Sequence, residues 1–490
     1  MKKVANLISS AALLFLMAAV VAAQIPDTDW YNNNPNATSF TISTADELAG
    51  LAAIVNGTTN VIEGRYIFSG KTITLNKNID LSVYDNWVPI WIFAGTFKGN
   101  GHVISNLFIN NPDKDYQGLF GGIYGGRVEN LGLDNVNIIG KNGVGSIAAA
   151  ILDNGTVTDC YSIGVVSGNY DVGGVVGAVF DNSYLTNSYF IGSVSAIYDG
   201  VGGVVGSVLV ESVISNSYSA GTVSSTGKDV GGVVGAVNEF SYVFNSYSII
   251  TAIGSENVGG VAGYVNNNSI ISNCYSAGAV RASGFGRSSG GVVGYVRGSS
   301  VINCAALNPE VRGRAGCGRI IDFISSEYIL SNNVAYAEML NYGGGTGWPN
   351  KGTDNRDGED ITIAQVLADG TIGGRFITEN GWTVANGSLP GLFGNTVPLP
   401  EHLGGTFVKY SFRQSQTAPV QLISISNRTL NLRLTNVGKV DIYALNGAKL
   451  HSLDFAQGSH THRLNDLPRG MYVVRATSGA WKQSVRMVVK

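Results

Sequence analysis

Charged side chains are scarce in this 490-residue chain: Asp, Glu, Lys and Arg make up only 13% of it, and the formal net charge is −3. Because nucleic-acid binding depends on a strong basic excess, we expect no nucleic-acid partner. Proline is scarce too, at 11 residues, which excludes a collagen-like or proline-rich linker protein. Beyond the N-terminus, no apolar run reaches the roughly 20 residues of a membrane-spanning helix.

Residues for common catalytic and metal sites are few, with five histidines and four cysteines. The HExxH motif of zinc peptidases is missing. No CxxC pair is present, which argues against a zinc site. We therefore expect no catalytic residue, no metal and no cofactor.

Glycine is abundant instead, at 66 residues, and the hydrophobic content of 44% is high enough to build a core. The chain begins with Lys2 and Lys3, an apolar run over 11–23, and small residues up to Ala23. This pattern is typical of a secretory signal peptide, which we predict over 1–23 with cleavage after Ala23. A membrane anchor is less favoured because the run is short.

The middle of the chain is a repeat built on the block VGGVVGAV over 172–179. Related blocks align on positions 117, 145, 173, 202, 231, 259, 290 and 318, so the steps are 28, 28, 29, 29, 28, 31 and 28 residues. A second block, NSYSAGTV over 216–223, keeps phase with the first. The first residues of this block and of its relatives form one column: Asn130, Asp159, Asn187, Asn216, Asn245, Asn273 and Asn303. An apolar residue always stands two positions before each member of this column.

These segments are short, β-branched and punctuated by glycine, and none has the 3.6-residue apolar spacing of a helix. The sequence therefore predicts an all-β fold: a parallel β-helix-like solenoid of ~28-residue repeats, whose coils stack about 4.8 Å apart. Stacking would turn equivalent residues into columns, and asparagine side chains in one column can hydrogen-bond from coil to coil.

Short helices are predicted at the ends of the solenoid. A capping box, Thr44-x-x-Glu47, precedes a helix over 44–56, and Thr362-x-x-Gln365 opens another that runs through Leu367. The segment 382–393 is expected to close the stack. We divide the chain into a signal peptide (1–23), an N-terminal cap and first coils (24–115), the repeat solenoid (116–345), a C-terminal cap (346–395), a linker (396–420) and a C-terminal domain (421–490).

The C-terminal domain differs from the solenoid in pattern and in charge. Short alternating strands are predicted over 430–434, 439–445 and 471–476, which suggests a small β-sandwich. Residues 401–490 hold 4 acidic and 12 basic side chains, net +8, whereas 115–310 hold 13 acidic and 6 basic ones, net −7. A basic, separate module favours recognition or anchoring over catalysis.

Two columns are candidate sites. Tyr161, Tyr189, Tyr218, Tyr247 and Tyr275 would form an aromatic strip for sugars or protein partners if they face outward. We favour the alternative that they form an internal or corner ladder that stabilises the stack. Cys274 and Cys304 fall in one column of adjacent coils, within reach of a disulfide, although two reduced inward thiols are favoured.

Carboxylates provide two weaker candidates. Asp171 and Asp229 share a column two coils apart with Gly200 between them, a separation of about 9–10 Å that approaches that of inverting glycosidases. Solvated turn positions explain this pair equally well. Asp354, Asp357, Glu359 and Asp360 form an acidic loop without the spacing of an EF-hand, so we expect a turn there rather than a calcium site.

The repeat resembles that of GLUG-motif bacterial surface proteins, through the GGVVG and NSYS blocks and the segments WVPI (87–90), FKGNGH (97–102) and GLFG (118–121). The tail resembles the type A C-terminal sorting domain of the type IX secretion system. The matching segments are VDIY (440–443) with Asn446-Gly447, LPRGMYVVR (467–475) and the terminal VVK. The key motif residues there are Leu467, Pro468, Gly470, Tyr472, Arg475 and Lys490.

The second resemblance implies a Gram-negative bacterium, recognition by the type IX machinery, and a secreted or outer-membrane cell-surface location. Repetitive solenoids offer extended binding surfaces. We therefore expect a non-catalytic adhesin or binding scaffold for glycans or extracellular matrix. The alternatives are a polysaccharide-degrading β-helix enzyme, a lyase or a glycoside hydrolase, and a structural spacer.

Overall fold

The structure, a computed structural model, describes residues 26–489 apart from 58–60, 63–64, 67, 285–288, 315, 343–346, 406–419, 427–428, 435–437, 445–448, 457, 465, 469 and 479–480. The predicted signal peptide, most of the predicted linker, Asn446-Gly447 and Lys490 therefore lie outside the described residues.

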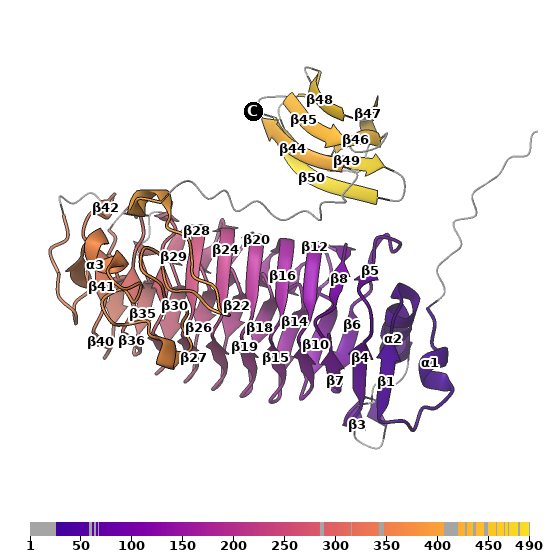
Figure 1. The fold of residues 1–490 in the computed structure, drawn as a ribbon, viewed down its shortest axis with the longest axis horizontal. Helices are drawn as coiled ribbons and strands as arrows, with labels where there is room; N and C mark the ends of the chain where they lie inside the picture. The colour runs from indigo at the N-terminus through magenta and orange to yellow at the C-terminus, as the bar shows by residue number, and fades with distance from the viewer. Residues whose placement is uncertain are drawn as a thin grey trace, which may run out of the picture.

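The repeats form a parallel β-solenoid, as predicted (Figure 1). One coil shows how each repeat folds, with four short strands separated by tight corners: β17 (Tyr170–Gly173), β18 (Val176–Val179), β19 (Tyr184–Thr186) and β20 (Tyr189–Ala196). Equivalent strands of successive coils pair in parallel, so the stack consists of long sheets running along its axis.

Within the described residues the solenoid has four such sheets. The eleven-stranded sheet joins β1 (Ser39–Ile42), β4 (Thr72–Leu75), β7 (Thr96–Lys98), β11 (Arg127–Glu129), β15 (Thr156–Thr158), β19, β23 (Val213–Ser215), β27 (Tyr242–Phe244), β31 (Ile270–Ser272), β36 (Ser300–Ile302) and β40 (Ile329–Ser331). The nine-stranded sheet joins β6 (Ile90–Phe93), β10 (Phe120–Tyr124), β14 (Ala148–Leu152), β18, β22 (Val205–Val208), β26 (Val234–Val237), β30 (Ala262–Asn266), β35 (Val293–Arg297) and β39 (Ile321–Ser325).

The other two sheets complete each coil. The fifteen-stranded sheet joins β5 (Ile79–Asp80), β8 (Val103–Ser105), β9 (Phe108–Asn110), β12 (Gly132–Ile139), β16 (Tyr161–Gly168), β20, β24 (Tyr218–Ser225), β28 (Tyr247–Gly254), β32 (Tyr275–Ser276), β33 (Val280–Ala282), β37 (Ala305–Ala306), β38 (Glu310–Arg312), β41 (Val334–Tyr336), β42 (Leu340–Asn341) and β43 (Glu359–Ile361). The six-stranded sheet joins β13 (Asn142–Val144), β17, β21 (Val201–Gly202), β25 (Lys228–Gly231), β29 (Glu256–Gly259) and β34 (Ser289–Gly290).

The strand register follows the repeat alignment. Gly173 pairs with Gly202, and the same column continues through Gly231, Gly259, Gly290 and Gly318. The apolar column forms the interior, because every member has 0% exposure: Val128, Val157, Leu185, Ile214, Val243, Ile271 and Val301. Burying each of these side chains stabilises the fold by about 1.5–3 kcal/mol, which explains why a coil needs its neighbours.

The asparagine column forms a corner of each coil. Its members have left-handed backbones, with φ between 49° and 54°, a conformation that Asn and Asp tolerate better than most residues. Their side chains also bond from coil to coil, as predicted. Asn216 Nδ2 donates to Asn187 Oδ1 at 3.2 Å, and Asn303 Nδ2 donates to Asn273 Oδ1 at 2.6 Å.

The N-terminal end begins with α1 (Asp29–Asn32) and α2 (Ala45–Gly57), and a hairpin pairs β2 (Val61–Ile62) with β3 (Arg65–Tyr66). The predicted capping box is present: Glu47 N donates to Thr44 Oγ1 at 3.1 Å, and Thr44 N donates to Glu47 Oε2 at 3.0 Å. None of the helices in the described ranges is both long enough and apolar enough to cross a membrane.

The second capping box opens α3 (Ile363–Leu367), where Thr362 is the N-cap residue. Two short 3-10 helices follow at Thr378–Asn380 and Glu401–Leu403. The segment 371–397, which we call the strap, does not close the end of the stack as expected. It runs back along the fifteen-stranded sheet, where its aromatic residues contact Tyr189 to Tyr275 (Figure 1).

The C-terminal domain contains two antiparallel sheets, as predicted for a small sandwich. The first joins β44 (Val420–Ser426), β45 (Thr429–Leu434) and β48 (Gly458–Arg463). The second joins β47 (Lys449–Phe455), β46 (Gly438–Ala444), β49 (Gly470–Ser478) and β50 (Trp481–Val489). Of the predicted motif residues, Leu467 is buried and Pro468 is exposed, while Gly470, Tyr472 and Arg475 lie on β49.

Candidate functional site

The five tyrosines of the predicted strip stack face to face along the fifteen-stranded sheet. Neighbouring ring centroids lie 4.7–5.2 Å apart, and interplanar angles are 2–7°. Because each inner ring uses both faces on its neighbours, the ladder can offer a ligand mainly ring edges. Burial, followed by the charge of Tyr161, raises the pKa of Tyr189 to about 12.

The strap covers one end of this ladder. Trp382 packs against Tyr247 and Tyr275 at 6.1 and 5.8 Å, and Tyr275 Oη donates to Pro390 O at 2.6 Å. Tyr247 and Tyr275 are 4% and 0% exposed, so they are closed to ligands in this structure. This packing matches the favoured interpretation of a stabilising ladder. Binding at the half-buried members Tyr161, Tyr189 and Tyr218 stays a prediction.

The cysteine column lies inside the solenoid. Cys160, Cys274 and Cys304 are 1%, 0% and 0% exposed, and each is a free thiol. Burial raises the pKa of Cys160 and Cys304 to about 12 and that of Cys274 well above its ordinary range. Such thiols are protonated and unreactive at neutral pH. The structure therefore agrees with the reduced alternative for Cys274 and Cys304.

Asp171 and Asp229 lie at a second left-handed corner, with φ of 51° and 56°. The same column holds Tyr116, Gly143, Gly200 and Asn257, all with positive φ. Ser207 Oγ donates to Asp171 Oδ1, and Asn257 Nδ2 donates to Asp229 Oδ1 at 2.7 Å. Burial raises the pKa of both carboxyls, that of Asp229 to about 6. The left-handed corner thus explains why aspartate occurs at these two positions. A catalytic role for them stays an alternative.

The acidic loop surrounds a buried guanidinium that the sequence did not reveal. Arg319 is 0% exposed and donates to Asp360 Oδ1 at 2.6 Å, and its Nε donates to Asp357 O at 2.8 Å. Asp357 is itself buried and accepts from Asn350 N at 2.8 Å, and Asp354 accepts from Asn332 N at 3.1 Å. Among the described residues no His, Cys, Asp and Glu side chains group to hold a metal ion.

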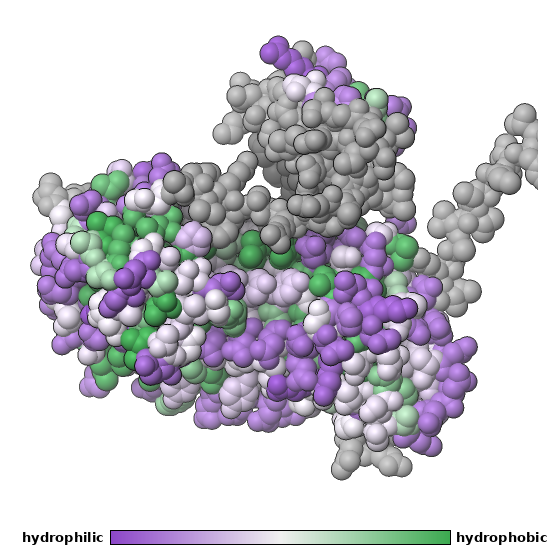
Figure 2. Space-filling view, in the orientation of Figure 1, coloured by the Kyte–Doolittle hydropathy of each residue, from purple (hydrophilic) through white to green (hydrophobic). Residues whose placement is uncertain are grey.

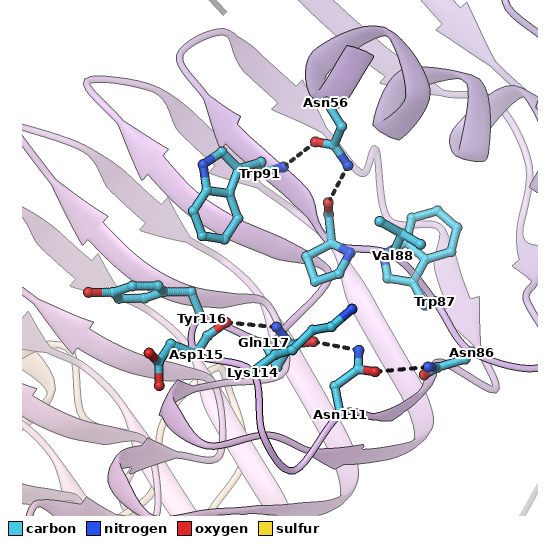
Figure 3. A pocket seen from close by; sticks show the side chains of 11 residues that line it. Asn56, Asn86, Trp87, Val88, Trp91, Asn111, Lys114, Asp115, Tyr116 and Gln117 are labelled. Carbon is cyan, nitrogen blue, oxygen red and sulfur yellow. Dashed lines mark hydrogen bonds between the residues drawn. The ribbon is translucent and has the colours of Figure 1, made fainter.

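A groove of about 610 Å³ lies near the N-terminal end of the solenoid, between β6, the end of α2 and the loop before β10 (Figure 3). Three of its apolar side chains are unusually exposed: Val88 at 62%, Trp91 at 44% and Tyr116 at 47%. The rings of Trp91 and Tyr116 meet edge to face, with centroids 5.9 Å apart. The groove therefore presents two aromatic surfaces to solvent.

Amide side chains hold the groove in shape. Asn56 accepts from Trp91 N at 3.0 Å and donates to Pro89 O at 2.9 Å, which ties α2 to β6. Asn86 donates to Asn111 Oδ1 at 3.1 Å, and Asn111 donates to Gln117 Oε1 at 2.8 Å. These bonds position the loop from which Tyr116 projects.

One charged side chain also enters the groove. Lys114 is exposed, and its ammonium group points toward Val88, whereas the carboxylate of Asp115 points away from it (Figure 3). Trp87 is 2% exposed, and its indole Nε1 donates to Leu119 O at 3.3 Å. The groove combines apolar faces, hydrogen-bonding amides and one cation, the typical composition of a small-ligand or sugar site.

The sequence did not predict this groove, because its residues come from the first coils and from the start of the first repeat block, and no repeating column links them. Trp87, Val88 and Pro89 belong to a segment that indicated only a resemblance to GLUG-motif proteins, not a site. Trp91 lies on β6, directly after these three residues, and Tyr116 lies 25 positions later, in the loop before β10. A signal did exist: three tryptophan and tyrosine residues, Trp87, Trp91 and Tyr116, stand near runs rich in Asn.

Comparison with known families identifies the C-terminal domain. Residues 424–490 match the family described as "Secretion system C-terminal sorting domain". The chain carries a type IX sorting domain. It is therefore handled by the type IX secretion machinery and is secreted to the cell surface or surroundings of a Gram-negative bacterium.

One curated relative is similar to part of the chain. Halomucin of Haloquadratum walsbyi is 35% identical over 148 residues, which cover 27% of this chain and 2% of Halomucin. The match thus spans a very small part of that protein. No solved structure matches the chain.

Proposed function

We propose that this type IX-secreted solenoid is a non-catalytic binding scaffold, of the GLUG type, that holds a glycan in the groove around Trp91 and Tyr116. The observation that supports this function is the pair of exposed rings, at 44% and 47%, beside amide side chains and Lys114. Sugar rings have apolar C–H faces that pack on aromatic rings, and their hydroxyl groups need hydrogen-bond partners.

The visible surface is unlike that expected for a featureless spacer. Figure 2 shows hydrophobic side chains gathered at the C-terminal end of the solenoid, near α3 and β35, and hydrophilic ones over its middle. Export to the cell surface also brings the groove to a place where it can meet extracellular polymers. Adhesion would then follow from ligand binding in the groove.

The test is to incubate the secreted protein with a panel of plant polysaccharides, mucins and matrix proteins. Bound protein and released reducing sugar are read in the same wells. We expect retention on at least one polysaccharide without sugar release, and about tenfold weaker retention for Trp91→Ala. The matched control is Tyr184→Ala, since Tyr184 is 42% exposed on the eleven-stranded sheet, away from the groove.

Two results would overturn the proposal. Sugar release would favour the enzyme, and loss of that release in Asp171→Asn or Asp229→Asn would assign it to those carboxylates. Retention on no polysaccharide would favour the spacer, and retention on matrix proteins alone would favour a protein-binding adhesin.

A further inference from the structure

The groove continues along one corner of the solenoid. Lys141 N donates to Lys114 O at 2.8 Å, Asn169 N donates to Lys141 O at 2.5 Å, and Tyr198 N donates to Asn169 O at 2.9 Å. These residues therefore occupy one column in four successive coils. At about 4.8 Å per coil, the column runs about 14 Å along the axis from the groove to Tyr198.

Aromatic rings lie at both ends of this corner. Tyr116 N donates to Asn142 O at 2.7 Å, and Asn142 pairs in turn with Tyr170 on β17. Tyr170 and Tyr198 are 42% and 45% exposed and stack with centroids 4.6 Å apart at 16°. Because Tyr198 covers Tyr170 from the following coil, the other face of Tyr170 points back toward the groove.

The ring of Tyr116 extends over the intervening coil. The intervening coil has Gly143 in the column of Tyr116, and a Cβ there would lie 3.0 Å from the Tyr116 ring. Tyr116 therefore leans over a residue without a side chain. The ring thus extends the aromatic surface of the groove toward the coil of Tyr170.

Two cations on this corner are open to an anionic ligand. Lys114 and Lys141 are exposed on adjacent coils, and within the described residues neither lies within 4.0 Å of a carboxylate oxygen. Lys228, farther along the corner, is different because it pairs with Glu256 at 2.7 Å.

Three of the nearby carboxylates accept hydrogen bonds within the chain, and a fourth, that of Asp113, is exposed beside Lys114. Asp115 Oδ1 accepts from Asn142 N at 3.3 Å, Asp171 accepts from Ser207, and Asp199 accepts from Lys228 N at 2.7 Å. The two lysines are therefore the cations in this part of the corner that are open to a ligand.

We propose that a linear acidic polysaccharide, a chain of uronic acid units, lies along this corner. One sugar ring would pack on Trp91 and Tyr116, carboxylates would meet Lys114 and Lys141, and a further unit would pack on Tyr170. This inference rests on the proposed function and adds the ligand's charge and length to it. A single terminal sugar would fill the groove alone and would not reach Lys141 or Tyr170.

The test is to measure binding of the full secreted protein to labelled oligosaccharides. The probes are acidic dimers and octamers of galacturonate, mannuronate and glucuronate, with neutral glucose and xylose octamers as comparison. At least one acidic octamer should bind about tenfold more tightly than its dimer and than the neutral octamers. Its binding should weaken as NaCl is raised from 0.05 to 0.5 M, because salt screens exposed charges.

Variants outside the groove separate the two proposals. Lys141→Gln and Tyr170→Ala should each weaken binding of the acidic octamer about tenfold and leave the dimer unchanged. The matched controls are Lys228→Gln, on the same corner but ion-paired, and Tyr184→Ala; both should bind as the parent protein does.

Each failure has a distinct meaning. Equal affinity for dimers and octamers, equal affinity for neutral octamers, or no effect of both corner variants would overturn the extended acidic site. If Trp91→Ala still abolished binding in those cases, the glycan-binding groove would stand. Binding of no oligosaccharide or polysaccharide at all would overturn both proposals.

Discussion

Arg319 and Asp360 form an ion pair at the C-terminal end of the solenoid, with Nη1 2.6 Å from Oδ1. The guanidinium is completely buried, while the carboxylate is 38% exposed and also binds Lys351 at 2.7 Å. Burial alone would raise the pKa of Asp360, but its bonds to Lys351 and Arg319 outweigh that effect and lower it. Arg319 also donates to the backbone oxygens of Asp357 and Gly358.

We predict that Arg319→Met destabilises the protein by about 3 kcal/mol, because it leaves buried carbonyl groups without donors and breaks a buried ion pair. Urea unfolding followed by circular dichroism measures the loss. The control is Lys228→Met, whose ion pair with Glu256 is exposed and should contribute less than about 1 kcal/mol. Equal losses for the two variants would contradict a structural role for the buried arginine.

A second prediction concerns the repeat glycines, where the close packing leaves no room for a side chain. An added Cβ at Gly231 would lie 1.9 Å from Val234 O, a backbone atom that cannot move away alone. Gly231→Ala should therefore cost at least about 2 kcal/mol. At Gly57, at the end of α2, an added Cβ meets nothing within 4 Å, so Gly57→Ala should be neutral or slightly stabilising. Thermal melting of both variants tests the contrast, and a stable Gly231→Ala protein would refute this packing.

The sequence could predict the solenoid because its columns repeat. Gly202 pairs with Gly231, and Asn216 bonds to Asn187, at the positions that the ~28-residue alignment indicates. The strap could not be predicted in the same way. Phe393 contacts Tyr189, about 200 positions earlier in the chain, and no periodic signal links residues so far apart. The groove is similar, since Trp91 precedes the repeat blocks and Tyr116 stands at the start of the first one, with no repeating column that links the two.

The strap leads to a third prediction. Trp382 is 2% exposed and packs against Tyr247, Tyr275 and Phe376, with a 4.9 Å centroid distance to Phe376. Trp382→Ala should cost about 3–5 kcal/mol through lost packing and should make 371–397 sensitive to protease.

The matched variant is Trp382→Phe. The indole Nε1 of Trp382 is buried without a hydrogen-bond partner in the part of the chain that the structure describes, so its removal breaks no hydrogen bond there. Trp382→Phe should then cost less than about 1.5 kcal/mol and leave the strap resistant. Limited proteolysis with mass spectrometry locates the cuts, and cleavage in Trp382→Phe as fast as in Trp382→Ala would contradict the packing argument.

The raised pKa of Asp229 makes stability depend on pH. Burial is the main cause, and it raises the pKa from an ordinary 3.8 to about 6 despite the hydrogen bond from Asn257. The folded protein therefore holds this proton more tightly than the unfolded chain does. The resulting contribution to stability is fully present below about pH 4 and is lost as pH rises through about 6. At neutral pH the carboxylate is charged, and its burial is a cost.

Asp229→Asn removes that cost and keeps the backbone conformation, because Asn tolerates the φ of 56° and Asn257 has a φ of 52° in the next coil. The variant should be close to the parent at pH 4 and exceed it by about 3 kcal/mol at pH 7.5. Urea unfolding at pH 4, 5, 6 and 7.5 measures the difference. A gap that stays constant with pH would mean that folding does not shift the pKa of Asp229, and a variant weaker than the parent at pH 7.5 would mean that the folded protein stabilises the carboxylate; either result would contradict this account.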